Sequence, residues 1–282
     1  MKPEWLKIKY ADNDEIRAVE ALLTQLNLNT VCSQALCPNY MECFGRRTAT
    51  FMILGVHCTR NCRFCNVTYA PPEPVDADEP RRIGEAVRQL ELKYVVVTSV
   101  TRDDLADGGA YHFAEVVRAI RAASPETAIE VLIPDLQGDV GALECVKAAK
   151  PDIISHNVET VPRIYAQVRP QADYRRSLHV IKKIGAGVEA AHSKSGMMLG
   201  LGETWDEVIR VFNDLREAGC EFLSVGQYLA PSKQHHPVIE YIHPDVFDRY
   251  AEAARELGFA YVASAPLVRS SYRADGALAG GE

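Results

Sequence analysis

The sequence predicts an α/β protein, a partial (β/α)6 barrel of the TIM type that carries N-terminal and C-terminal extensions. From residue 51 onward, short apolar runs alternate with amphipathic helical stretches. Continuous apolar strands between helices are typical of a parallel sheet that is covered on both faces. About six such units in roughly 215 residues fit a full or partial barrel. The pattern alone also allows a flat, doubly wound sheet.

The expected elements follow from the period of the apolar residues. Strands are expected at residues 51–55, 94–99, 129–133, 153–156, 197–199, 222–225 and 260–263. Helices are expected between them, at residues 80–92, 111–123, 138–149, 175–184, 205–218 and 244–257. A further short helix is predicted at residues 14–26, with Asn13 or Asp14 as its cap. Four prolines between residues 70 and 80 predict an extended loop.

Composition limits the classes of function. The 282 residues are 47% hydrophobic and 24% charged, as in ordinary soluble globular proteins. A formal net charge of −7 argues against a nucleic-acid surface. No apolar run reaches the roughly 18 residues of a membrane helix, and residues 1–10 lack the apolar core of a signal peptide. We therefore expect a cytoplasmic protein that binds neither nucleic acid nor membrane.

The pattern of apolar and polar residues divides the chain into three segments. Residues 1–50 are largely irregular and form an N-terminal extension. Residues 51–265 hold the alternating strands and helices of the core barrel. Residues 266–282 form a C-terminal segment, and its small and polar residues from Ala274 onward predict a mobile tail.

Six of the eight cysteines fall within 34 residues, which in a cytoplasmic chain indicates metal ligands rather than disulfides. Cys58, Cys62 and Cys65 have the spacing C-x3-C-x2-C directly after the first predicted strand. Three thiolates can hold three corners of a 4Fe–4S cluster and leave one iron open for a substrate or cofactor. A zinc site with His57 as fourth ligand is the weaker interpretation, because paired C-x2-C motifs are missing.

The remaining cysteines differ in their spacing. Cys32, Cys37 and Cys43 have the spacing C-x4-C-x5-C, and beside a cluster site they indicate a second cluster that again needs a fourth ligand. Cys145 and Cys220 are isolated, and we expect each to be a small buried apolar residue.

The first of these triplets, with Phe64 before its last cysteine at the start of a β/α region, resembles the radical S-adenosylmethionine (SAM) superfamily. The two triplets in this order resemble the lipoyl synthase family within it. The resemblance covers nearly the whole chain, and its further motifs lie at residues 3–6, 29–32, 98–104, 156–159, 194–203, 226–229 and 269–272.

The resemblance implies a sulfurtransferase with two 4Fe–4S clusters and SAM as cofactors. One cluster would cleave SAM to a 5′-deoxyadenosyl radical, and the other would donate sulfur. Two sulfur atoms would enter at C6 and C8 of an octanoyl-lysine on a lipoyl carrier domain. That domain would be the E2 subunit of a 2-oxo-acid dehydrogenase or the glycine cleavage H protein. An electron donor and a carrier that rebuilds the spent cluster are further implied partners.

The resemblance also assigns individual residues. Cys58, Cys62 and Cys65 would hold the SAM-cleaving cluster, and the other triplet would hold the second cluster together with a serine of the Arg-Ser-Ser-Tyr tail. We favour Ser270, with Ser271 as the alternative. Oxygen is a poor ligand for these clusters, so it can leave when sulfur is given up. A turn or cap would be the ordinary role of such serines.

The candidates for SAM contacts stand beside the cysteines or at strand ends: Phe64, Thr98, Ser99, Asn157, Glu159, Arg175 and Lys194. Phe64 would lie by the adenine. Asn157 and Glu159 would accept hydrogen bonds from the amine or ribose, and Arg175 would pair with the carboxylate. Phe64 alone is as well explained by packing beside the cluster, and each of the other candidates by a solvated or helix-end position.

Besides a zinc-stabilised interaction module, two alternatives stay open. One is another radical SAM enzyme with an auxiliary cluster, of the biotin synthase or methylthiotransferase type, although the spacing of Cys32, Cys37 and Cys43 and the tail argue against it. The other is an electron-transfer protein with two clusters, which predicts four cysteines for each cluster. The neighbouring His235 and His236 are expected on the surface, because adjacent side chains point in different directions.

Overall fold

The computed structural model describes residues 2–7, 14–34, 37, 39, 42–43, 50–186, 191–272, 276 and 278. The chain forms two compact units. Unit 1 comprises Met1–Lys7, Asn61–Cys65 and Ser155–Glu282, and unit 2 comprises Ile8–Arg60 and Asn66–Ile154. These units divide the chain differently from the segments 1–50, 51–265 and 266–282, which stay a prediction.

Unit 2 contains the first parallel strands of the chain. Its strands are β1 (Asn29–Thr30), β2 (Thr50–Ile53), β3 (His57–Cys58), β4 (Thr68–Tyr69), β5 (Tyr94–Ser99) and β6 (Ala128–Leu132). Strand β5 pairs in parallel with β2 on one side and with β6 on the other. Strand β1 pairs with β2 in the antiparallel direction, and β3 and β4 form a separate parallel ribbon.

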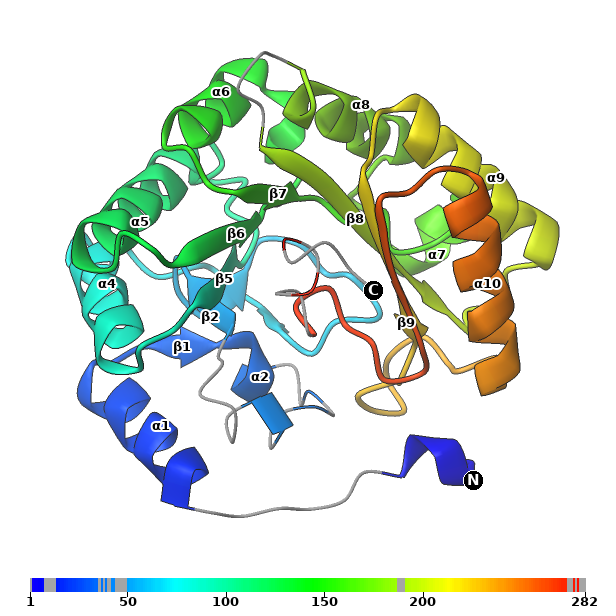
Figure 1. Ribbon diagram of the computed structural model, residues 1–282, viewed down its shortest axis with the longest axis horizontal. Coiled ribbons are helices and arrows are strands. Elements are labelled where there is room, and N and C mark those ends of the chain that lie inside the picture. The colour runs from blue at the N-terminus through cyan, green and yellow to red at the C-terminus, as the bar shows by residue number, and fades with distance from the viewer. Residues whose placement is uncertain are drawn as a thin grey trace. The chain divides into compact units, whose positions relative to one another are not determined.

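The helices of unit 2 are α1 (Asp14–Gln25), α2 (Val31–Gln34), α4 (Glu79–Gln89), α5 (Ala110–Ala123), the 3-10 turn η2 (Leu136–Gly138) and α6 (Val140–Ala148). Helices α4, α5 and α6 lie on the outer side of β5 and β6 (Figure 1). Helix α4 packs so closely on α5 that a Cβ atom at Gly84 would lie 2.8 Å from the carbonyl oxygen of Ala119. Asp139 begins α6 by accepting hydrogen bonds from the amides of Gly141 and Ala142.

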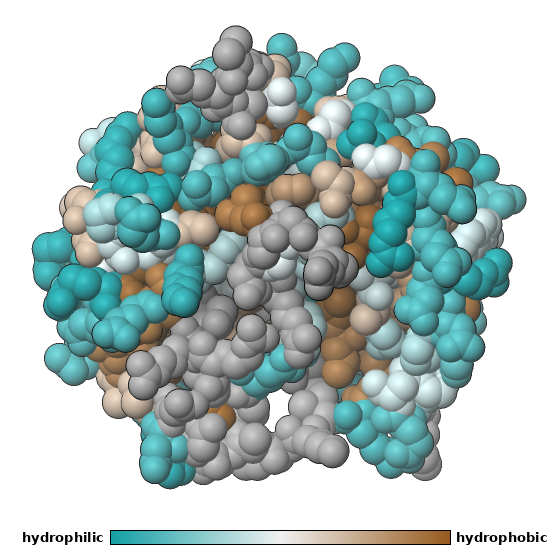
Figure 2. All heavy atoms as spheres, in the orientation of Figure 1, coloured by the Kyte–Doolittle hydropathy of each residue, from teal (hydrophilic) through white to brown (hydrophobic). Residues whose placement is uncertain are grey.

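Unit 1 continues the same alternation. The chain passes from unit 2 to unit 1 within strand β7 (Ile153–Ser155). The strands that follow are β8 (His192–Leu199), β9 (Phe222–Gln227) and β10 (Tyr261–Ser264), and they pair in parallel in the order β8-β9-β10. Its helical elements are η1 (Glu4–Leu6), η3 (Pro162–Ile164), α7 (Tyr165–Val168), α8 (Tyr174–Ile184), α9 (Trp205–Glu217) and α10 (Pro244–Glu256). Hydrophilic side chains predominate on the outward faces of α8 and α9 (Figure 2).

The core of unit 1 is formed where the apolar faces of α9 and α10 meet the strands. Val211, Phe212 and Phe247 are completely buried there, which is the main source of stability in such a layered fold. Thr204 starts α9 with a capping box, since its hydroxyl accepts from the amide of Glu207 while the Glu207 carboxylate accepts from the amide of Thr204.

The predicted α/β class with parallel strands is confirmed in both units. Along the described chain, six strands are each followed by a helix, from β2 and α4 to β9 and α10. Strand β8 begins at His192 rather than at residue 197, because the buried polar residues Ser193, Lys194 and Ser195 hide it from a hydropathy pattern. Cys220 is buried as expected, whereas Cys145 is only half-buried.

Two predicted features lie partly or wholly outside the described residues. The mobile tail predicted from Ala274 onward lies outside the described residues except for Gly276 and Leu278. The expected cap Asn13 also lies outside them, but α1 does begin at Asp14. Among the helices that the structure describes, not one combines the length and the apolar character of a membrane span.

Candidate active site

Cys58 ends the short strand β3 in unit 2, and two backbone amides point at its sulfur. The amide of Arg60 lies 3.4 Å from Sγ, and the amide of Thr101 lies 3.3 Å from it. Hydrogen bonds to a cysteine sulfur tune the potential of the iron–sulfur cluster that this sulfur holds. The surroundings of Cys58 therefore suit a cluster ligand.

The chain around Cys58 is held by the loop that follows β5. Both the amide and the hydroxyl of Thr59 donate to the carbonyl oxygen of Thr101, at 3.1 and 2.9 Å. The amide of Asp103 donates to the Thr59 hydroxyl. These bonds fix the backbone of Cys58 against the carboxyl end of a neighbouring strand, where barrel enzymes place their reactive groups.

Arg60 forms the charged support of this loop. Its guanidinium lies between Asp103 and Asp135, with nitrogen–oxygen distances of 2.6 and 2.7 Å, and the side chain of Asp135 is completely buried. Burial alone would lower the pKa of Arg60, but hydrogen bonds to the two carboxylates raise it. Arg60 is thus a permanent cation that joins the cysteine loop to the loops after β5 and β6.

A second buried pair supports the end of β2. The carboxylate of Glu79 lies 2.7 Å from His112 Nε2 and accepts a hydrogen bond from the amide of Leu54. Arg102 Nη1 donates to the carbonyl oxygen of Leu54. Leu54 has a left-handed φ of 68°, which is uncommon for a non-glycine residue. These contacts hold the sharp turn that leads from β2 towards Cys58.

Thr98 and Ser99, two of the predicted SAM contacts, end strand β5. The Thr98 hydroxyl donates to the carbonyl oxygen of Leu132 at 2.8 Å, so it is used within the sheet. Ser99 Oγ is buried, and no described residue is its hydrogen-bond partner. A buried hydroxyl without a partner is unfavourable, and Ser99 therefore remains open to a bound ligand.

Cys62 and Cys65 lie in unit 1, in a turn that is closed by a hydrogen bond from the Cys65 amide to the Cys62 carbonyl oxygen at 3.1 Å. The amide of Arg63 donates to the carbonyl oxygen of Val168. Phe64 packs against the core cluster of this unit, which agrees with simple packing and leaves its expected place by the adenine a prediction.

His235 and His236 are not ordinary surface residues, contrary to the sequence-based prediction. Both are half-buried. His235 Nε2 lies 3.1 Å from the carbonyl oxygen of Cys65, and the amide of His236 donates to the carbonyl oxygen of Arg63 at 2.8 Å. The loop after β9 folds back on the cysteine turn, and no local sequence pattern could have indicated this contact.

Asn157 and Glu159 follow β7 and lie beside β8 in unit 1. Asn157 Nδ2 donates to Glu159 Oε1 at 3.1 Å, and Asn157 Oδ1 is buried without a described partner. Glu159 has a left-handed φ of 66°, fixed by backbone hydrogen bonds with Gly196 and Met198. Burial raises the pKa of Glu159, although Arg169 acts in the opposite direction. Such strain in a buried polar group is common at functional sites.

Lys194 and Ser270 meet at the same place. Lys194 on β8 is buried, and its Nζ donates to the carbonyl oxygen of Ser270 at 2.6 Å. The Ser270 hydroxyl accepts a hydrogen bond from Asn157 Nδ2 at 2.7 Å. Ser271 is half-buried next to it. The structure therefore brings together four of the predicted site residues, Asn157, Glu159, Lys194 and Ser270.

Arg175 does not join this group, because it is exposed in the first turn of α8. Arg169, which the sequence analysis missed, is nearly buried instead. Its Nη1 donates to the carbonyl oxygen of Asn157 at 3.0 Å and to the hydroxyl of Tyr165 at 2.9 Å. An arginine within a few residues of the predicted one was the available signal, but the choice depends on tertiary packing.

The second triplet lies in unit 2. The amide of Cys37 donates to the carbonyl oxygen of Cys32, and the amide of Cys43 donates to that of Asn39. Burial raises the pKa of the Cys32 thiol to about 11. The neighbouring residues 35–36, 38, 40–41 and 44–49 lie outside the described part of the chain.

The chemistry of both triplets fits iron–sulfur clusters. Every cysteine is a free thiol, and thiolates are the ligands that these clusters prefer. Within the described residues, no three His, Cys, Asp or Glu side chains are gathered closely enough to hold a metal ion. The fit therefore depends on the type and spacing of the donors and on the amides that point at Cys58.

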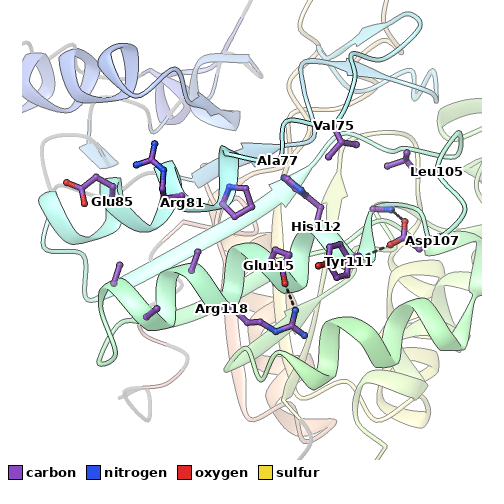
Figure 3. Close-up of a pocket in the computed structure, with 15 residues that line it drawn as sticks. Val75, Ala77, Arg81, Glu85, Leu105, Asp107, Tyr111, His112, Glu115 and Arg118 are labelled. Atoms are coloured by element: carbon purple, nitrogen blue, oxygen red, sulfur yellow. Dashed lines mark hydrogen bonds and ion pairs between the residues drawn. The ribbon is translucent and has the colours of Figure 1, made fainter.

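The groove between α4 and α5 in unit 2 is a separate feature, with a volume of 940 Å³. Arg81 and Glu85 reach it from α4, and Tyr111, Glu115 and Arg118 reach it from α5 (Figure 3). Its charges are paired locally, as in the contact between Arg118 and Glu115. None of the predicted ligands lines this groove, so we do not assign it to the active site.

Comparison with known proteins defines the class. Residues 52–215 match the family model of the radical SAM superfamily. Among solved structures, the chain resembles HydG, a maturase of the FeFe-hydrogenase, with a TM-score of 0.60 at 15% identity over 96% of this chain and 68% of that one. It also resembles Streptococcus suis SuiB bound to SAM, with a TM-score of 0.59 at 10% identity over 80% and 54%. The fold is that of radical SAM enzymes.

Curated relatives define the family more closely. A lipoyl synthase of Caldicellulosiruptor saccharolyticus is 57% identical over 97% of this chain and 96% of its own length. A lipoyl synthase of Trichlorobacter lovleyi is 57% identical over 97% of each chain. This chain belongs to the lipoyl synthase family, whose members are radical SAM sulfurtransferases that use SAM and 4Fe–4S clusters. The predicted family, enzyme class and cofactors are confirmed.

Proposed function

We propose that this chain inserts two sulfur atoms at C6 and C8 of an octanoyl-lysine on a lipoyl carrier domain. Family membership supports the reaction. One contact carries the assignment of residues, namely the hydrogen bond between the Ser270 hydroxyl and Asn157. It links the proposed ligand of the sulfur-donating cluster to a residue proposed to contact SAM.

The reaction needs a radical because the two carbons carry unactivated C–H bonds. The cluster and SAM, when bound, supply a 5′-deoxyadenosyl radical that removes these hydrogens. Cys58, Cys62 and Cys65 would hold the cluster that binds SAM, and the amides of Arg60 and Thr101 would donate hydrogen bonds to the Cys58 sulfur.

The second triplet and Ser270 would hold the cluster that donates sulfur. Serine oxygen is a hard ligand that binds iron–sulfur clusters poorly, and it can leave when the cluster gives up sulfur. Asn157 and Glu159 would bind the amine or ribose of SAM through their buried oxygen atoms. Ser99, whose hydroxyl has no described partner, would contribute a further hydrogen bond.

The partners follow from the reaction. The substrate would be a carrier domain such as an E2 subunit or the H protein, and an electron donor would reduce the first cluster. A cluster carrier would rebuild the second. We place this reaction in the cytoplasm, because thiolate ligands and reduced clusters need a reducing compartment.

The test is the formation of 5′-deoxyadenosine by anaerobic protein that was reconstituted with iron and sulfide. With SAM and a strong reductant, the wild-type enzyme is expected to form deoxyadenosine, either by turning over an octanoyl-lysine peptide or in the background reaction that the reductant drives. The variant Cys62→Ala should form none. Deoxyadenosine at the wild-type rate from that variant would overturn the assignment of the first triplet.

A further inference from the structure

In unit 1, the C-terminal segment after β10 packs against strands β8 and β9. We call the surface of these strands that contacts the segment its seat. The amide of Ala265 donates to the carbonyl oxygen of Val225, and the amide of Gln227 donates to that of Pro266. At Gly226 a Cβ atom would lie 2.1 Å from the carbonyl oxygen of Val268. The backbone of the segment therefore approaches β9 so closely that only glycine fits.

Gly196 on β8 forms the other wall of this seat. A Cβ atom there would lie 2.6 Å from Ser224 Oγ, 2.9 Å from Asn157 Oδ1 and 3.1 Å from Ser270 Oγ. A side chain of any size at this position must displace one of these three polar groups. The absence of a side chain at residue 196 is what allows Ser270 and Asn157 to meet.

Lys194 fixes the backbone of the segment. It is only 2% exposed, and its Nζ donates to the carbonyl oxygen of Ser270 at 2.6 Å. Burial of an ammonium group is costly unless hydrogen bonds compensate for it. The Ser270 carbonyl is one such acceptor, and it ties the tail to strand β8 of unit 1.

Asn157 fixes the side chain of Ser270. Both protons of its amide nitrogen are used, one towards the Ser270 hydroxyl at 2.7 Å and one towards Glu159 at 3.1 Å. Its Oδ1 is buried and has no described partner. An open acceptor beside a carboxylate is suited to an ammonium group, such as the amine of SAM.

We infer that Lys194 and Asn157 are positioning residues for Ser270, and that Gly196 provides the space in which they hold it. This inference rests on the proposed role of Ser270 as a cluster ligand. Lys194 holds the backbone, and Asn157 holds the hydroxyl.

The first experiment measures hydrogen–deuterium exchange of residues 266–272 in the full, iron-free chain. Lys194→Met, Asn157→Ala and Gly196→Ala are expected to speed exchange about two- to tenfold, which corresponds to the loss of one hydrogen bond. The matched controls are Lys182→Met, Asn213→Ala and Gly185→Ala. Lys182 and Asn213 are exposed on helices, and a methyl group at Gly185 would make only ordinary contacts. Exchange that stays at the wild-type rate in the three test variants would overturn the inference.

The second experiment isolates the sulfur-donating cluster. In a full chain with Cys58, Cys62 and Cys65 changed to alanine, Mössbauer spectra report whether one iron has a ligand other than sulfur. Ser270→Ala should abolish that signal, and Gly196→Ala should weaken it at least twofold, while Gly185→Ala should not. If Ser270→Ala abolishes the signal and Gly196→Ala leaves it unchanged, Gly196 does not help to position Ser270, but Ser270 is still the cluster ligand. If Ser270→Ala changes nothing, both fail.

Discussion

His235 Nε2 lies 3.1 Å from the carbonyl oxygen of Cys65, although 170 residues separate the two in sequence. A carbonyl oxygen can only accept, so Nε2 must carry the proton. The other ring nitrogen, Nδ1, lies 2.8 Å from the hydroxyl of Ser232 and can accept from it. The contacts define one tautomer of the ring and give it a fixed orientation towards the cysteine turn.

His235→Ala should weaken the hold on Cys65. We expect a roughly two- to tenfold slower cleavage of SAM from the loss of one half-buried hydrogen bond, together with a changed midpoint potential of the first cluster. His235→Gln should restore much of both, because its amide can donate in place of Nε2. His179→Ala, on the exposed face of α8, serves as control. EPR-monitored redox titration is the measurement, and a His235→Ala potential equal to that of the wild type would contradict this role.

The two cysteine triplets should be separable by substitution. Alanine at Cys58, Cys62 or Cys65 should abolish deoxyadenosine formation, because two thiolates do not hold a 4Fe–4S cluster in place for SAM. Alanine at Cys32 or Cys37 should leave deoxyadenosine formation intact and stop sulfur insertion. Both products can be quantified by liquid chromatography. Loss of deoxyadenosine in a folded Cys37→Ala protein would contradict the division of roles.

Arg60→Met should destabilise unit 2 strongly. The variant leaves the completely buried Asp135 without its guanidinium, and breaking such a buried pair costs about 3–5 kcal/mol. Urea denaturation of the iron-free chain measures the change in unfolding free energy. The double variant Arg60→Met/Asp135→Asn should recover part of the loss, and Arg81→Met, at an exposed pair, should change it by less than about 1 kcal/mol. Equal effects of Arg60→Met and Arg81→Met would refute this view.

Cys220 should resist alkylation in the folded chain. Burial raises the pKa of its thiol to about 12, so at pH 8 only about one thiol in ten thousand is ionised. The half-buried Cys145 should react first. Mass spectrometry after timed exposure to iodoacetamide gives the order, and adding urea should bring Cys220 to the rate of Cys145. Fast modification of Cys220 without denaturant would show that its surroundings open readily.

The arrangement of strands and helices could be predicted because it is encoded locally. The apolar run at β5 and the amphipathic period of α9 each identify an element by themselves. The start of β8 could not be found in this way, because Ser193 and Lys194 are polar and yet buried. Their burial is compensated by hydrogen bonds to Gly219 and Ser270, which are distant in sequence.

The candidate site was predictable where spacing along the chain defines it and not where tertiary contacts do. The six cysteines and Ser270 are predicted from their spacing and from the family resemblance. Arg60, Arg169 and His235 act through partners up to 170 residues away, and no local pattern indicates them. Arg175 is exposed in α8, and a position after a strand does not define which side of a helix a residue faces.

The most direct measurement of the central claim is the mass of an octanoyl-lysine peptide after an anaerobic reaction with the reconstituted enzyme, SAM and a strong reductant. We expect a mass gain of two sulfur atoms for the dithiol product, or of two sulfur atoms less two hydrogens for the cyclic disulfide. The gain should be absent with Cys37→Ala and greatly reduced with Ser270→Ala. An unmodified peptide beside abundant deoxyadenosine, from enzyme shown to hold both clusters, would contradict it.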